Sequence, residues 1–78
     1  MQQGKALTIQ EIRSRAQAIK PHIRPGCLIL QPPLEMVHKV SRCTVHVISI
    51  DESGKYPGTV HTRELGFWHP ADQFEFPD

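Results

Sequence analysis

Residues 43–50 constrain the fold of this chain more than any other segment. They read Cys-Thr-Val-His-Val-Ile-Ser-Ile, with β-branched side chains at five of eight positions and neither Gly nor Pro. Such side chains favour extended backbone, and a strand that is apolar on both faces needs cover on both sides of its sheet. We therefore predict that residues 43–50 form the central strand, with Val45, Val47 and either Ile48 or Ile50 buried.

A helix is predicted near the N-terminus. Thr8 and Glu11 have the spacing of a capping box, in which each side chain accepts a hydrogen bond from the backbone N–H of the other residue. Apolar residues then recur at helical intervals, at Ile9, Ile12, Ala16 and Ile19. Pro21 cannot donate to a helix and disfavours helical geometry at the residue before it. These signals predict a helix over residues 9–19.

Shorter strands are predicted on both sides of the central one. Residues 27–30 form an apolar run after a Pro-Gly turn, and we expect the two prolines at 32–33 to end it. Residues 34–41 have both strand-like and helix-like spacing, and we favour extended structure. Residues 58–65 are expected to return antiparallel to the central strand.

The last residues predict an aromatic corner. Residues 67–72 are expected to contain one helical turn, and residues 74–76 alternate like a short closing strand.

A chain of 78 residues fits one domain, residues 1–78, with a single small core. A helix followed by short antiparallel strands predicts an α+β fold, in which helix 9–19 packs on a sheet of three to five strands within residues 27–76. This order is compatible with an SH3-like curled barrel. Because small cores are often completed by a second copy, a monomer and a homodimer are both compatible with the sequence.

Charge is distributed unevenly along the chain. Residues 1–42 contain seven of the nine Lys and Arg residues but only two of the eight acidic residues, so they carry +5. Residues 43–78 carry −4, which leaves a net charge of +1. We expect this split to give a dipolar surface that steers partners.

The basic half suggests a small nucleic-acid-binding regulator as an alternative function. Arg13, Arg15, Lys20 and Arg24 would lie on or just after the N-terminal helix, where they could contact phosphates. However, the pI of about 7.9 is lower than is usual for such domains. A solvated helix face is therefore favoured.

Five histidines and two cysteines raise the question of a metal site or a Cys/His enzyme. Structural zinc sites usually show two close ligand pairs, which this chain lacks. Cys43 and His46 are three residues apart in a predicted strand, so their side chains would point to opposite faces. His46 and His61 are expected to be cross-strand neighbours. No phosphate loop or nucleophile motif is present, and no enzyme, metal or cofactor is predicted.

The C-terminal end is rich in aromatic residues. Phe67, Phe74 and Phe76 are expected in the core, and Trp68 is expected to be partly exposed beside acidic residues. Such a surface can anchor a protein partner, and the residues predicted to form it are Tyr56, Trp68, His69 and Asp72. The leading prediction is a non-enzymatic protein-interaction module, or an inhibitor or accessory protein of a mobile element.

Membrane and export signals are not seen in the sequence. No apolar run approaches the roughly 18 residues of a membrane span, and the first residues lack the apolar stretch of a secretory signal. Cys27 and Cys43 are expected to be free and buried. We therefore predict a cytoplasmic protein that does not bind membranes.

The capping box gives a first testable prediction. Thr8→Ala removes the side-chain acceptor for an N–H at the helix N-terminus and should lower the free energy of unfolding by about 1 kcal/mol. Thermal unfolding followed by circular dichroism measures the change. An unchanged Tm would show that the helix begins elsewhere or is not docked.

Overall fold

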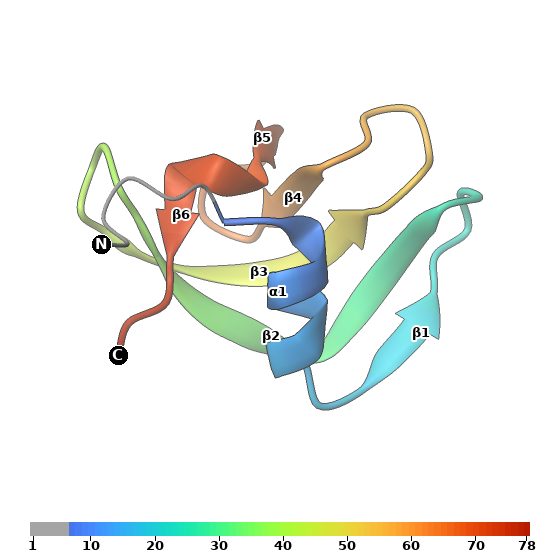
Figure 1. Cartoon of the computed structure of the whole chain (residues 1–78), viewed down its shortest axis with the longest axis horizontal. Coiled ribbons are helices and arrows are strands. Elements are labelled where there is room, and N and C mark those ends of the chain that lie inside the picture. The colour runs from blue at the N-terminus through green and yellow to red at the C-terminus, as the bar shows by residue number, and fades with distance from the viewer. Residues whose placement is uncertain (1–6) are drawn as a thin grey trace.

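The computed structural model describes residues 7–78. These residues form mainly an antiparallel sheet with one short helix (Figure 1). In chain order the elements are α1 (Ile9–Arg15), β1 (Ile19–Pro21), β2 (Cys27–His38), β3 (Thr44–Asp51), β4 (Thr59–Thr62), β5 (Trp68–Pro70), a 3₁₀ turn (Ala71–Gln73) and β6 (Phe74–Glu75). This content fits the predicted α+β class, but the sheet has six strands rather than three to five and begins at Ile19 rather than at residue 27.

The helix begins where the capping box predicts and ends earlier than expected. The Thr8 hydroxyl accepts a hydrogen bond from the backbone N–H of Glu11 (3.3 Å), and the Glu11 carboxylate accepts one from the backbone N–H of Thr8 (2.9 Å). The helix stops at Arg15, so the predicted end at Ile19 was wrong. Ile19 lies in β1 and pairs with β2. Its helical spacing from Ile12 and Ala16 therefore did not indicate that it belongs to the helix.

The strand β3 lies in the middle of the sheet, as predicted. The order of hydrogen-bonded strands is β1-β2-β3-β4-β5, and β3 is antiparallel to both β2 and β4. Val45, Val47 and Ile50 are completely buried, whereas Ile48 is half-buried. The predicted central strand and its antiparallel return are thus confirmed, but β3 begins one residue later than predicted and β4 ends at Thr62 rather than at residue 65.

The strand β2 continues through its two prolines instead of ending at them. Its first half pairs with β1, its end pairs with β6, and its register against β3 shifts between Ile29 and Leu34. Pro32 and Pro33 lie in this interruption of the ladder, where a missing N–H is tolerated. Figure 1 shows that the strand bends sharply along its length. The segment after the prolines is extended, as we favoured, as far as His38.

The end of the chain returns to β2. The 3₁₀ turn precedes β6, and β6 pairs with Val37 and His38 at the end of β2. This agrees with the predicted helical turn and closing strand. At the other end of the strand order, β5 pairs only with β4 among the described strands. The sheet is curved but does not form a closed barrel.

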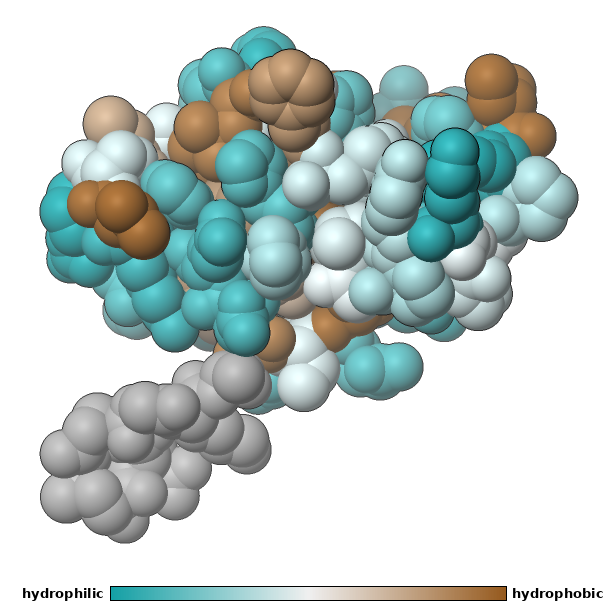
Figure 2. Space-filling model, turned by 90° about the horizontal axis from the view of Figure 1, so that it is seen from above, coloured by the Kyte–Doolittle hydropathy of each residue, from teal (hydrophilic) through white to brown (hydrophobic). Residues whose placement is uncertain are grey.

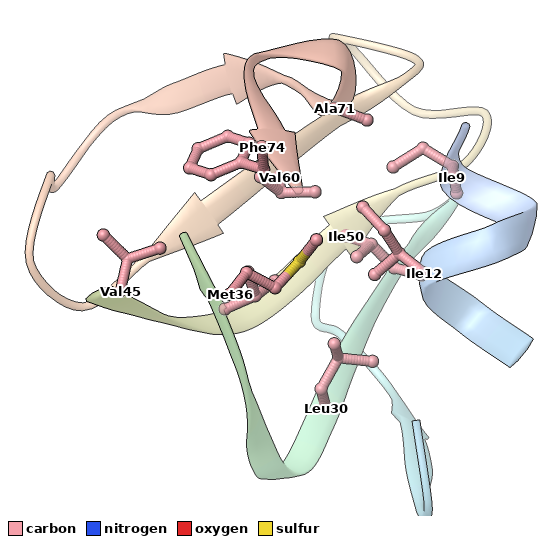
Figure 3. Packing of buried hydrophobic residues seen from close by; sticks show 10 residues of the cluster. Ile9, Ile12, Leu30, Met36, Val45, Ile50, Val60, Ala71 and Phe74 are labelled. Carbon is pink, nitrogen blue, oxygen red and sulfur yellow. The ribbon is translucent and has the colours of Figure 1, made fainter. Parts of the chain in front are cut away.

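The core lies between α1 and the sheet. Figure 3 shows Ile12 of α1 beside Ile50 of β3, with Met36 of β2 pointing toward them. The other buried members of this cluster come from the helix and from five different segments of the sheet region: Ile9, Leu30, Val45, Val47, Val60, Ala71 and Phe74. A single small apolar cluster therefore joins the helix to the sheet.

Val47 at the centre of the sheet provides a second prediction. Val47→Ala leaves a cavity at a fully buried position and should lower the free energy of unfolding by about 1–3 kcal/mol. Urea denaturation measures this change. Amide hydrogen exchange gives an independent readout, because amides of a central strand should exchange slowly. Fast exchange throughout Thr44–Asp51 would contradict the central position of β3.

Candidate functional site

Ion pairs cancel much of the charge split that the sequence shows. Four pairs each join an arginine from residues 1–42 to a carboxylate from residues 43–78, with N···O distances of 2.8–3.0 Å: Arg13–Glu52, Arg15–Asp78, Arg24–Asp51 and Arg42–Glu75. Three of the four pairs involve exposed arginines and each contributes little to stability. In all four pairs the two opposite charges neutralise each other locally. These eight residues therefore do not build the expected dipolar surface.

The pair Arg24–Asp51 contains a fully buried carboxylate. Asp51 has 0% of its surface exposed. Its oxygens accept hydrogen bonds from the backbone N–H groups of Gly54 (2.5 Å) and Tyr56 (2.8 Å) and from the Arg24 guanidinium (2.9 Å). Burial of a carboxylate without such partners would be costly. Asp51 is the last residue of β3, and its carboxylate fixes the loop that follows through the N–H groups of Gly54 and Tyr56.

The turn between β1 and β2 packs directly against the loop after β3. A Cβ added at Gly26 would lie 2.5 Å from the backbone nitrogen of Gly54, so no larger residue fits there. The backbone N–H groups of Glu52 and Ser53 also donate hydrogen bonds to the carbonyl oxygen of Gly26. This close backbone contact fixes the loop that carries Tyr56.

Arg24 connects these turns to two aromatic rings. Besides its pair with Asp51, its Nε donates to the Sγ of Cys27 at 3.1 Å. Its guanidinium carbon lies 4.9 Å from the centre of the Trp68 ring and 5.6 Å from the centre of the Tyr56 ring. Cation–π contacts of this kind contribute about 0.5–2 kcal/mol each. Arg24 therefore links the buried carboxylate of Asp51 to the rings of Trp68 and Tyr56.

Tyr56, Phe67 and Trp68, together with Thr59, line a pocket of about 250 Å³ that we call the aromatic pocket. Phe67 is 76% exposed and Tyr56 is 45% exposed, while Trp68 is half-buried. The prediction that Phe67 lies in the core was wrong. Phe74 fills the core, as predicted, and Phe67 lies in the turn that leads into β5.

His61 supports the aromatic pocket from β4. Its ring stacks on that of Trp68, with 5.3 Å between ring centres and an angle of 27° between the planes. The expectation that His46 and His61 are cross-strand neighbours was wrong, because the register pairs His61 with Ser49. The ring of His46 instead pairs with the carboxylate of Glu64.

Two of the four residues predicted to form a partner surface meet at this pocket. Tyr56 and Trp68 line it. His69 follows Trp68 in β5 and therefore points to the other face, where its ring lies 6.4 Å from that of Phe74. Asp72 is exposed and lines a different pocket, beside the start of α1. The aromatic pocket therefore has no carboxylate in its lining, contrary to the acidic surface that we expected.

The arginines of the nucleic-acid alternative are occupied by carboxylates. Arg13, Arg15 and Arg24 each form one of the ion pairs described above. Lys20 is exposed on β1 rather than on a helix, and Lys5 lies outside the described residues. Phosphate binding through the three arginines would first have to break three ion pairs.

Cysteines and histidines do not converge on one point. Cys27 is buried and Cys43 is exposed, and both are free, so the expectation of two buried thiols was half wrong. His38 and His69 are neighbours, with 6.0 Å between their ring centres. Within residues 7–78, no group of three or more His, Cys, Asp or Glu side chains is placed to hold a metal ion.

No protein-family model, curated protein or solved structure matches this chain. In the part of the chain that the structure describes, no helix is long and apolar enough to cross a membrane.

The buried carboxylate predicts an acid-sensitive fold. Burial acts to raise the pKa of Asp51, but hydrogen bonds from the Tyr56 and Gly54 N–H groups and the charge of Arg24 outweigh it and hold that pKa below its usual value. Such a group stabilises the folded state above its unfolded-state pKa of about 3.9, and this stabilisation is lost as the pH falls through the folded-state pKa. The free energy of unfolding should therefore decrease below about pH 4.

Asp51→Asn tests this account. At pH 7 the variant leaves Arg24 without its counter-charge and should lose about 3 kcal/mol of unfolding free energy, and its stability should depend less on acid than that of the wild type. Asp72→Asn is the control, because Asp72 is exposed and its change should stay within about 0.5 kcal/mol. Urea denaturation between pH 7 and pH 3 gives all three curves. Equal acid dependence of Asp51→Asn and the wild type would contradict the role of Asp51.

Proposed function

We propose that this protein is a non-enzymatic interaction module that binds a partner protein through the aromatic pocket. The observation that carries the proposal is the exposure of two large rings on a fixed base. Phe67 is 76% exposed and Tyr56 is 45% exposed. Burial of such rings against a partner removes a large apolar area from contact with water, which favours binding. Aromatic residues are also enriched among those that contribute most to binding energy.

The pocket has a rigid base, which favours binding. Trp68 contacts both Arg24 and His61, and Arg24 is held in turn by the buried Asp51. A surface that is already ordered loses less conformational entropy when a partner docks. The exposed ring of Phe67 then lies beside a base whose side chains have fixed partners.

The chemistry of the lining also favours binding over catalysis. The only catalytic group types among the four lining residues are the hydroxyls of Thr59 and Tyr56, because the lining has no carboxylic acid, thiol, imidazole or amine that could act as a general base or activate a hydroxyl. The hydroxyl of Thr59 already donates to the carbonyl oxygen of Tyr56 (2.6 Å). At about 250 Å³ the pocket is smaller than most small-molecule sites, which range from roughly 300 to 1,000 Å³. It fits a side chain of a partner better than a separate substrate.

Exposed apolar residues are otherwise scattered. Figure 2 shows brown groups separated by teal and white residues on the face that it presents. Val40 is 79% exposed and Ile23 is 97% exposed, but neither lines the aromatic pocket. Single exposed apolar residues are normal on protein surfaces, whereas three aromatic rings around one pocket are the stronger sign of a binding site.

We also propose that the elements of this chain follow the order found in SH3-like barrels. The meander β2-β3-β4-β5, the 3₁₀ turn and the return of β6 to β2 follow the order expected of such a barrel. This comparison concerns architecture and supports no function by itself. We place the module in the cytoplasm, where the free thiols of Cys27 and Cys43 would remain reduced.

Selection from a phage-displayed library of random peptides tests the proposed function. Peptides selected on the wild type should lose at least about tenfold in affinity for Phe67→Ala, which removes an exposed ring anchor. The free energy of unfolding of Phe67→Ala should differ from that of the wild type by less than about 0.5 kcal/mol, because the ring is mostly exposed. Val40→Ala is the matched control, since it truncates another exposed apolar side chain and should bind like the wild type.

Two results would contradict the proposal. Selected peptides that bind Phe67→Ala and the wild type equally would show that the aromatic pocket is not the binding surface. A salt-sensitive gel shift with single-stranded DNA that Phe67→Ala retains, and that the Arg13→Glu/Arg15→Glu variant loses, would favour the nucleic-acid alternative.

A further inference from the structure

We propose that the aromatic pocket recognises an extended acidic segment of its partner, with an apolar side chain in the pocket and a neighbouring Asp or Glu side chain against Lys55. This inference rests on the proposed function and names the chemistry of its ligand. It follows from the charges around the pocket, from the cations that already lie against its rings, and from the position of the pocket at the edge of the sheet.

The charge beside the pocket is positive and incompletely neutralised. Lys55 Nζ lies 5.5 Å from the centre of the Tyr56 ring, and Lys55 forms no ion pair within residues 7–78. Arg24 also lies against Tyr56 and Trp68, but its charge is balanced by Asp51. One exposed cation therefore remains beside a lining that contains no carboxylate. A partner carboxylate complements this arrangement.

The same cations disfavour a cationic ligand. Aromatic cages bind methylated lysine through the negative faces of their rings. Here Arg24 lies over Trp68 and Tyr56, and Lys55 lies over Tyr56. A further cation in the pocket would meet rings that already have cationic neighbours, together with the like charge of Lys55. A neutral apolar side chain does not meet this repulsion.

The number of free cations favours a peptide over a nucleic acid. Affinity for nucleic acids grows with the number of phosphates that a protein neutralises. Among residues 7–78, two cations lie over rings of the aromatic pocket, and of these Arg24 is paired with Asp51 while Lys55 has no ion pair. One ion pair next to an apolar anchor suits a short acidic peptide, whose affinity should depend only weakly on salt.

The position of the pocket favours an extended ligand. Trp68 begins β5, and β5 pairs only with β4 among the described strands. The other edge of β5 therefore presents backbone groups that have no strand partner there. Extended peptides commonly add to such an edge, where main-chain hydrogen bonds give affinity and side-chain pockets give specificity. A peptide along β5 would pass the aromatic pocket.

Trp68 supplies a built-in probe for the test, because it is the one tryptophan of the chain. Three blocked peptides are titrated at 50 mM salt while its fluorescence is recorded: Ser-Asp-Leu-Glu-Leu-Ser, the neutral Ser-Asn-Leu-Gln-Leu-Ser and the basic Ser-Lys-Leu-Lys-Leu-Ser. A trimethyl-lysine peptide and oligo(dT) are titrated in parallel. The acidic peptide should bind up to about fivefold more tightly than the neutral one, the range of an exposed ion pair, and the basic peptide should bind most weakly.

Charge variants locate the effect. Lys55→Gln should bind the acidic and neutral peptides equally, and Lys55→Glu should reverse the order so that the basic peptide binds best. Lys20→Gln is the control, because Lys20 is an exposed lysine on β1, at the opposite end of the strand order from β5, and should keep the preference of the wild type.

The outcomes separate this inference from the proposed function. Equal binding of the acidic and neutral peptides, lost in Phe67→Ala, would overturn the acidic preference and leave the aromatic pocket as a binding site. Tighter binding of trimethyl-lysine or oligo(dT) would overturn the inference in favour of that ligand class. Absence of any fluorescence change with all five probes would overturn both proposals.

Discussion

The burial of Asp51 determines how the aromatic pocket is assembled. Its carboxylate collects two backbone N–H groups of one loop and the guanidinium of Arg24 from another turn. A fully buried carboxylate requires these partners, so the two segments must meet at this point. Arg24 then lies against Tyr56 and Trp68. One buried charge thus positions a surface that is otherwise built from loops and a short edge strand.

The features that the sequence predicts correctly are those whose causes lie within a few residues. The capping box joins Thr8 to Glu11, three residues apart, and the structure contains both of its hydrogen bonds. The run at residues 43–50 forms most of β3 (Thr44–Asp51) because its five β-branched side chains each favour extended backbone by themselves. The same run is apolar on both faces, which predicts a strand covered on both sides, and Val45 and Val47 are buried as expected.

The features that the sequence misses depend on partners far away in the chain. Ile19 continues the helical spacing of its own neighbours, but it pairs with Leu30 across a turn, and nothing local marks that pairing. Phe67 is a large apolar residue of the kind that usually lies in a core, yet it is exposed and Phe74 occupies the core. The charge split has the same limitation, because Arg15 and Asp78 are 63 residues apart and form an ion pair. Hydrophobicity and charge indicate what a residue can do, while the tertiary contacts decide whether it does so.

The ion pairs also determine which forces remain for recognition. Four arginines form ion pairs with carboxylates. Among the described residues, the Lys and Arg side chains without an ion pair are Lys20, Lys39, Lys55 and Arg63. Only one of these, Lys55, lies against a ring of the aromatic pocket. Long-range steering by a near-neutral surface is weak and is screened within about 8 Å at physiological salt. For the ligand that we propose, affinity would come mainly from burial of the exposed rings, and charge would add selectivity at short range. One apolar anchor and one adjacent carboxylate would use both contributions.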